Sequence, residues 1–133
     1  MQSAIHRSCS ASSSVQSSDV IDSNGEGVIF SGDSSTTSDS NVVRNNVISN
    51  SKIRWLVESY WSGPVGRGNT VHHNCLWPTN RNISYNKNDG VQPNAKGFTA
   101  ANNIKADPTF ADALNGDLTV PSGSGCRSDY LGP

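Results

Sequence analysis

The sequence repeats itself at intervals of 27, 28 and 29 residues, and this repeat limits the folds open to the chain. Four ungapped segments align: "VQSSDVIDSN" from Val15, "VVRNNVISNS" from Val42, "TVHHNCLWPT" from Thr70 and "TAANNIKADP" from Thr99. One aligned column is apolar and holds Val20, Val47, Cys75 and Ile104. The next column holds Ile21, Ile48, Leu76 and, out of pattern, Lys105. Self-similarity at a fixed period of this length is typical of repeat architectures.

The repeat has the character of strands. A second apolar stretch follows in three of the repeats, "VIF" from Val28, "WLV" from Trp55 and "ISY" from Ile83, and the spacing assigns these first residues to one column. The apolar residues form short β-branched runs bounded by Gly, Ser, Asn and Asp, without the i, i+3, i+4, i+7 spacing of a helix. We therefore predict a solenoid of about four coils with two strands each, in which neighbouring coils pair in parallel.

A polar column lies directly before the apolar one and holds Asp19, Asn46, Asn74 and Asn103. Asn adopts the left-handed backbone conformation of a sharp turn more readily than most residues. Stacked Asn side chains can also donate and accept amide hydrogen bonds along the stack. We expect Asn46, Asn74 and Asn103 to form such a structural ladder; the alternative is that they are ordinary turn residues on the surface.

Composition narrows the class of protein. The chain has 133 residues, enough for one domain, with 33% hydrophobic and 16% charged residues, which suits a thin fold held by backbone hydrogen bonds. A net charge of −1 excludes the basic footprint of a nucleic-acid-binding protein. No apolar run is long enough to span a membrane. The first residues, "MQSAIHRSCSASSS", lack the hydrophobic segment of a secretory signal, which leaves cytoplasmic residence or a chain cut from a longer secreted parent.

The three cysteines are Cys9, Cys75 and Cys126, and they form neither a CxxC pair nor a zinc spacing. They are either buried or free thiols, or Cys75 and Cys126 form a disulfide and Cys9 is left over. We expect no metal site and no cofactor.

Four stretches carry a resemblance to a known family: "NVVRNNVISNS" (41–51), "VESYWSGPVGRGN" (57–69), "HNCLW" (73–77) and "ADPTFADALNGDLTVPSGSGC" (106–126). Over roughly residues 15–130 the chain resembles the C-terminal part of bacterial secreted proteins of the pectate-lyase-like superfamily. It departs from their closing segment at Gly125, where they often have Pro. The resemblance implies an all-β, right-handed parallel β-helix. It also implies a carbohydrate-associated role, since the superfamily contains polysaccharide lyases, hydrolases and epimerases as well as proteins without catalysis.

The same resemblance suggests a division of the chain and a location. We expect a disordered or displaced segment at 1–14, β-helix coils at 15–110 and a C-terminal capping tail at 111–133. Resembling proteins have more coils on the N-terminal side, and Gln16 falls in an expected apolar column, so we expect a fragment truncated at that side, from an extracellular parent. An uncapped first coil would permit self-association through its strand edges.

The richest stretch for chemistry is Ile53–Asn74. Strand alternation, with Trp55 facing inward, predicts that Glu58 and Tyr60 point outward beside Trp61. Arg54, Tyr60 and Trp61 are therefore candidates for binding sugars. The alternative is a solvated strand face with the Trp packed under the following loop.

The candidates for catalysis are Glu58, Arg67, His72 and His73, since a histidine can act as a base near neutral pH. No two carboxylates can be assigned as the acid and nucleophile that hydrolysis requires. The function expected is that of a fragment of a secreted, carbohydrate-associated β-helix protein with polysaccharide as its partner and neither nucleic acid nor membrane. The alternative is a non-catalytic structural or adhesive solenoid that binds polysaccharide or protein.

Overall fold

The computed structural model describes residues 27–32, 35–50, 55–59, 64–77 and 90–126, and the backbone of 5–7, 14–16 and 19–20. The described parts contain one short 3₁₀ helix, η2 (Ala113–Asn115), and no helix long and apolar enough to cross a membrane. The strands are β1 (Ile5–Arg7), β2 (Ser14–Gln16), β3 (Asp19–Val20), β4 (Val28–Phe30), β5 (Val42–Arg44), β6 (Val47–Ser49), β7 (Val57–Ser59), β8 (Asn69–His72), β9 (Cys75–Trp77), β10 (Phe98–Ala101) and β11 (Ile104–Lys105).

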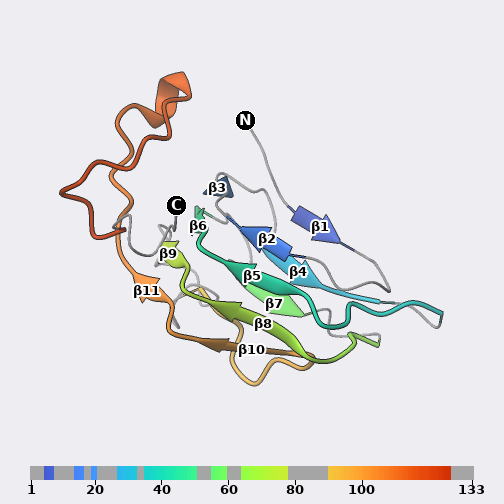
Figure 1. Ribbon diagram of the computed structural model, residues 1–133. Helices are drawn as coiled ribbons and strands as arrows, with labels where there is room; N and C mark the ends of the chain where they lie inside the picture. Colours follow the sequence, from blue (N-terminus) through green and yellow to red (C-terminus); the bar gives the residue numbers. More distant parts are fainter. Residues whose placement is uncertain are drawn as a thin grey trace.

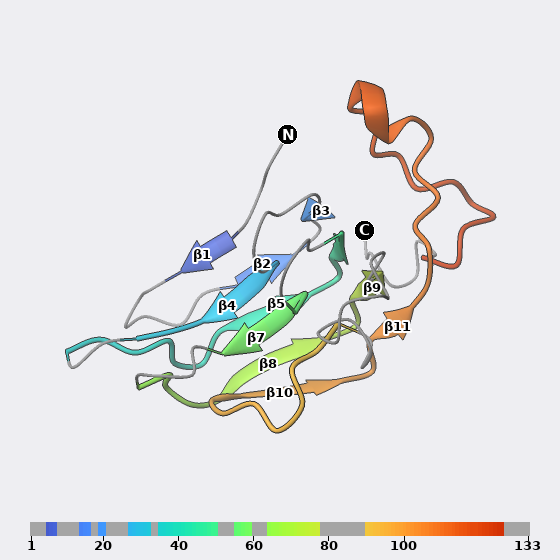
Figure 2. The ribbon, with the colours of Figure 1, turned by 180° about the vertical axis from the view of Figure 1, so that it is seen from behind.

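The strands form three sheets, and every pairing between neighbouring strands is parallel. Sheet A has the order β1-β4-β7, sheet B β10-β8-β5-β2 and sheet C β11-β9-β6-β3. The chain runs through sheets A, B and C in this order several times, and we call each such round a pass. In the fourth pass, Val91 contributes to sheet A through a parallel bridge with Val57. Figures 1 and 2 show the passes lying side by side. The predicted all-β fold with parallel strands is confirmed, with three strands per pass instead of two.

The register of the first pass differs from the predicted alignment by one residue. Val15 pairs with Val43, and Val20 pairs with Ile48, so Val20 does not share a column with Val47. Gln16 pairs with Arg44 and therefore does not occupy an apolar column. A shift of one residue moves every side chain of a strand to the other face. The position of Gln16 therefore does not indicate that the chain is truncated.

The register of sheet A was also predicted wrongly. Val28 pairs with Val57, not with Trp55, and Ile29 pairs with Glu58. Ile83, the third member of the predicted column, lies outside the described residues. The strand that we placed at residues 55–57 begins at Val57 in the structure. Residues 1–14, expected to be disordered or displaced, include β1, which pairs with β4 in parallel.

The interior of the stack is a single apolar cluster with members from all three sheets. Sheet B contributes Val43 and Val71, sheet C contributes Ile48 and Leu76, and sheet A contributes Val28, Phe30 and Val57. In the fourth pass two of these columns no longer hold a large apolar residue, because Ala100 pairs with Val71 and Lys105 pairs with Leu76. Fewer large apolar side chains therefore fill the interior in the fourth pass.

A second apolar cluster lies outside sheet C. Val47 and Cys75 are fully buried there with Cys126, and Ile104, Phe110 and Val120 pack against them. The column that we aligned as Val47, Cys75 and Ile104 is thus in register, but it contacts the C-terminal tail instead of the interior. Beyond this contact the tail projects from the sheets with η2 at its tip, as Figure 1 shows, and Leu114 is 99% exposed.

Candidate functional site

Two corners border sheet B in each of the passes that contain β5, β8 and β10, and both are built in the same way. A residue with positive φ turns the chain: Ser40, Gly68 and Gly97 (φ 54°, 71° and 81°) before β5, β8 and β10, and Asn45, His73 and Asn102 (φ 56°, 54° and 55°) after them. We expected the left-handed conformation at Asn46, Asn74 and Asn103, but it occurs one residue earlier. The ladder asparagines act through their side chains.

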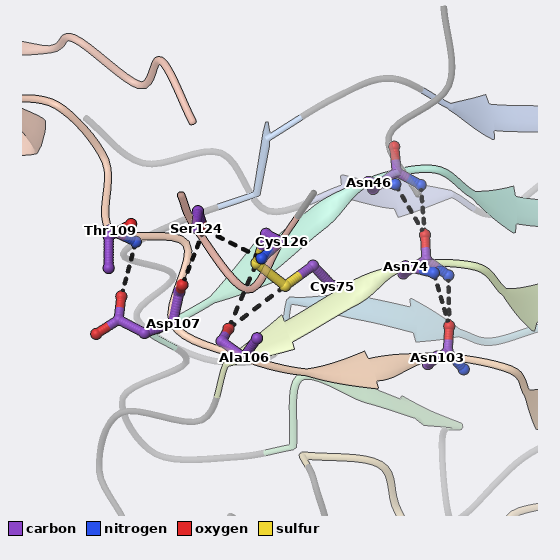
Figure 3. The surroundings of a disulfide bond; sticks show 9 residues. All are labelled: Asn46, Asn74, Cys75, Asn103, Ala106, Asp107, Thr109, Ser124 and Cys126. Atoms are coloured by element: carbon purple, nitrogen blue, oxygen red, sulfur yellow. Dashed lines mark hydrogen bonds between the residues drawn. A yellow bond between two sulfur atoms is a disulfide. The ribbon is translucent and has the colours of Figure 1, made fainter. Parts of the chain in front are cut away.

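Asn46, Asn74 and Asn103 form a continuous ladder of hydrogen bonds, drawn in Figure 3. The Oδ1 of Asn74 accepts from the backbone N–H and the Nδ2 of Asn46, at 3.1 and 2.9 Å. The Oδ1 of Asn103 accepts in the same way from Asn74, at 3.0 and 2.9 Å. Asn46 and Asn74 are fully buried, so water does not reach their polar groups. The ladder supplies the hydrogen-bond partners that these buried groups need.

A second ladder stands at the other corner and was missed in the sequence. Asn69 Oδ1 accepts from the backbone N–H and the Nδ2 of Asn41, at 2.9 and 2.7 Å, and Asn69 Nδ2 donates to the carbonyl of Gly97 at 2.8 Å. The ladder ends there because Phe98 occupies the next position, where its ring contacts Phe30 with centroids 5.1 Å apart. The sequence contains the signal, since Asn41 and Asn69 are 28 residues apart.

Cys75 and Cys126 are joined by a disulfide, with their Cα atoms 5.6 Å apart, in the structure shown in Figure 3. Around it, the backbone N–H of Cys126 donates to Ser124 Oγ at 3.0 Å, and that hydroxyl donates to the carbonyl of Asp107 at 3.1 Å. The disulfide therefore attaches the end of the tail to β9. Cys9 lies outside the described residues.

The outward side of sheet B is accessible to solvent on β5, β8 and β10. The inward residues of β5 and β8 are Val43 and Val71, so their neighbours point outward. These outward residues, which we call the open face, are Val42, Arg44, Thr70, His72, Thr99 and Ala101, and each is half-buried or exposed. Among the described residues the outward sides of the other sheets are less accessible: the tail covers part of sheet C, and Glu58 of sheet A is fully buried.

Charge and hydrogen-bonding groups line up on the open face. Arg44 pairs with His72, and Thr70 pairs with Thr99, so a cation, an imidazole and two hydroxyls occupy adjacent strands. His73 follows His72 at the corner and is exposed. The Nδ1 atoms of these two histidines are 2.8 Å apart. The described residues contain no group of three or more His, Cys, Asp or Glu side chains that could hold a metal.

The other predicted site residues do not gather at this face. Glu58, predicted at the surface, is fully buried on β7 in sheet A, whereas His72 belongs to sheet B. Arg67 is exposed before β8, and its backbone N–H donates to Asp39 Oδ1 at 2.8 Å. Arg54, Tyr60 and Trp61 lie outside the described residues. The catalytic roles of Glu58, Arg67, His72 and His73 remain predictions.

A hollow of about 280 Å³ lies at the end of the stack, beside the fourth pass. Leu76, Val91 and residues 100–105 line it. Its lining combines apolar residues with three polar ones, Asn102, Asn103 and Lys105. None of the candidates for catalysis lines it.

A family model described as disaggregatase related matches residues 10–130, nearly the whole chain. No curated protein matches the chain, and no solved structure does. The chain belongs to the disaggregatase-related family.

Proposed function

We propose that this chain is a segment of a right-handed parallel β-helix that binds polysaccharide through the open face of sheet B. The observation that carries the proposal is the register of Arg44 with His72 and of Thr70 with Thr99 on a solvent-accessible face of parallel strands. The family description names a disaggregatase and no ligand, so the ligand class belongs to the proposal.

The helical winding is supported by the order of the strands. Each pass visits sheets A, B and C in turn, and equivalent asparagines of successive passes are 28 or 29 residues apart. Connections between parallel strands of one sheet are right-handed in about 98% of known cases. A coil that returns to the same sheet in each turn therefore winds into a right-handed helix.

The ligand class follows from the shape and chemistry of the open face. Strands stacked about 4.8 Å apart repeat the same groups along a line, which suits a ligand that is itself a repeating chain. The hydroxyls of Thr70 and Thr99 and the imidazole of His72 can exchange hydrogen bonds with sugar hydroxyls. Arg44 adds a cation with several donors, which binds carboxylate or sulfate groups where the polysaccharide has them.

Catalysis is not required by this arrangement. Glu58 and His72 lie in different sheets, and Glu58 is fully buried, which favours binding over acid–base chemistry at a shared site. The pectate-lyase-like activities remain a hypothesis for the protein. The proposal includes an extracellular location, which the Cys75–Cys126 disulfide supports, because such bonds persist in oxidising compartments.

The proposal is tested by affinity electrophoresis through gels that contain neutral, carboxylated or sulfated polysaccharides. At least one of them should retard the protein, and the double variant Arg44→Ala, His72→Ala should weaken binding about tenfold or more, since a hydrogen bond to a charged group contributes about 1.5–3 kcal/mol. Lys96→Ala removes an exposed cation outside the open face and is the matched control. Equal weakening by Lys96→Ala, or no retardation in any gel, would contradict the proposal.

A further inference from the structure

His72 and His73 bring two imidazoles together at the end of β8. Successive residues of a strand normally point to opposite faces. The positive φ of His73, 54°, interrupts this alternation and turns its ring toward that of His72. The rings meet edge to face with centroids 5.1 Å apart, and their Nδ1 atoms are separated by 2.8 Å. His72 is half-exposed and His73 is exposed, so solvent reaches the pair.

We propose that this pair chelates a divalent transition-metal ion, copper(II) above all, through both Nδ1 atoms. Metal–imidazole bonds are about 2.0–2.1 Å long. With such bonds, a right angle at the metal sets the two nitrogens about 2.8–3.0 Å apart, and a tetrahedral angle sets them about 3.3–3.4 Å apart. The two Nδ1 atoms are hydrogen-bonded to each other at 2.8 Å, and this separation is close to that of a right angle, which tetragonal copper(II) and nickel(II) sites have, so both nitrogens can bind one ion once the proton between them has moved to Nε2. Each imidazole is then neutral with its proton on Nε2, and water fills the other positions.

The surroundings of the pair predict the order of affinities. His72 lies between Arg44, its partner on β5, and Ala101, its partner on β10. Asn45 and Asn102 occupy the positions equivalent to His73 in the neighbouring passes. None of these side chains is a carboxylate, so they add no anionic oxygen ligand that would favour a harder ion. The ion with the strongest intrinsic preference for nitrogen should therefore bind best, in the order copper(II), nickel(II), zinc(II).

The neighbouring passes supply conservative variants for the test. Ala101 occupies the position of His72 one pass later, and Asn102 occupies that of His73, so His72→Ala and His73→Asn introduce residues that the same corner already accepts. Untagged protein carrying Cys9→Ser is titrated with copper(II) sulfate by calorimetry, and the complex is examined by electron paramagnetic resonance. We expect one copper per chain with hyperfine coupling to two nitrogens.

Either histidine variant should lower the affinity for copper about tenfold or more, since it removes the chelate, and should remove one nitrogen coupling. His6→Ala, which changes the remaining histidine, should leave both readouts unchanged. Unchanged copper affinity in His72→Ala or His73→Asn would overturn the inference. Loss of binding in His6→Ala, or zinc binding as tight as that of copper, would also overturn it. The inference is independent of polysaccharide binding.

Discussion

Asn74 is the central member of its ladder, and its replacement by alanine should be among the most damaging polar changes in the chain. The Oδ1 of Asn74 is the shared acceptor for the N–H and the Nδ2 of Asn46, and its own Nδ2 donates to Val43 O and Asn103 Oδ1. Asn46 and Asn74 are fully buried, so water cannot replace these partners. Each buried donor that loses its acceptor costs about 1–3 kcal/mol, and two of them cost about 2–6 kcal/mol. A domain of this size is stable by only about 5–15 kcal/mol.

Asn103→Ala, at the end of the ladder, is the comparison for Asn74→Ala at its centre. Asn103→Ala also removes an acceptor shared by two donors, those of Asn74, but Asn103 is half-buried at the end of the ladder, so water can take its place. We expect a cost of about 1 kcal/mol for Asn103→Ala. Asn102→Gly, at a left-handed position next to the ladder, should cost less still, because glycine adopts this conformation freely.

The assay is urea denaturation followed by tryptophan fluorescence, with the disulfide kept oxidised. The account predicts that Asn74→Ala lowers the free energy of unfolding by at least about 2 kcal/mol more than Asn102→Gly does. If Asn74→Ala and Asn103→Ala cost the same, or if Asn74→Ala costs less than about 1 kcal/mol, burial does not determine the strength of the ladder and the reasoning is refuted.

Three further changes test other parts of the structure. His73→Val should destabilise by about 1–2 kcal/mol, since a β-branched residue resists the positive φ of 54°, whereas His73→Asn should be nearly neutral; equal effects in thermal unfolding would exclude a conformational cause. Cys126→Ser should lower the free energy of unfolding by about 2–4 kcal/mol, because the disulfide links residues separated by 51 positions, and limited proteolysis should then cut the tail first; unchanged resistance would contradict this. Hydrogen bonds from the side chain and then the backbone of Thr119 lower the pKa of Asp117 below its usual 3.8. The turn at Asp117 is therefore held fully above about pH 4 and loosens as the pH falls through the folded-state pKa. The Thr119 amide shift in a pH titration by nuclear magnetic resonance should follow this lowered pKa, and a midpoint at or above 3.8 would contradict it.

The sequence predicted best where side-chain chemistry repeats with the period of the passes. Asn46, Asn74 and Asn103 could be aligned because each pass places an amide at the same corner, and the chain is all β with parallel strands as expected. Our alignment of the first pass with the second was wrong by one residue. The stretch "VQSSDV" has serines and an aspartate where later passes have asparagines, so no asparagine marked its register. Asn45 and Asn46 divide what looked like one strand into β5 and β6, which is why two strands per repeat were predicted in place of three.

The candidate site was harder to predict, because burial depends on segments distant in sequence. Alternation along β7 placed Glu58 on the outer side of its strand, but it could not show that Glu58 would be fully buried there. The column of Val47 and Cys75 looked like the interior, but it is the outer side of sheet C, covered by the tail. Both errors have the same physical origin: the residues of a short strand do not show which of its sides will be covered by segments distant in sequence.

Each pass stacks on the next in a fixed register, and this register aligns the residues of the open face. Nuclear Overhauser effects on isotope-labelled protein test it most directly. The structure predicts contacts between the side-chain amide of Asn46 and that of Asn74, 28 residues away, and between those of Asn74 and Asn103. It also predicts contacts between the amides of β5 and β8 in the register that pairs Arg44 with His72. Absence of the asparagine contacts, or contacts shifted by one residue, would contradict the stacking and the proposed binding face with it.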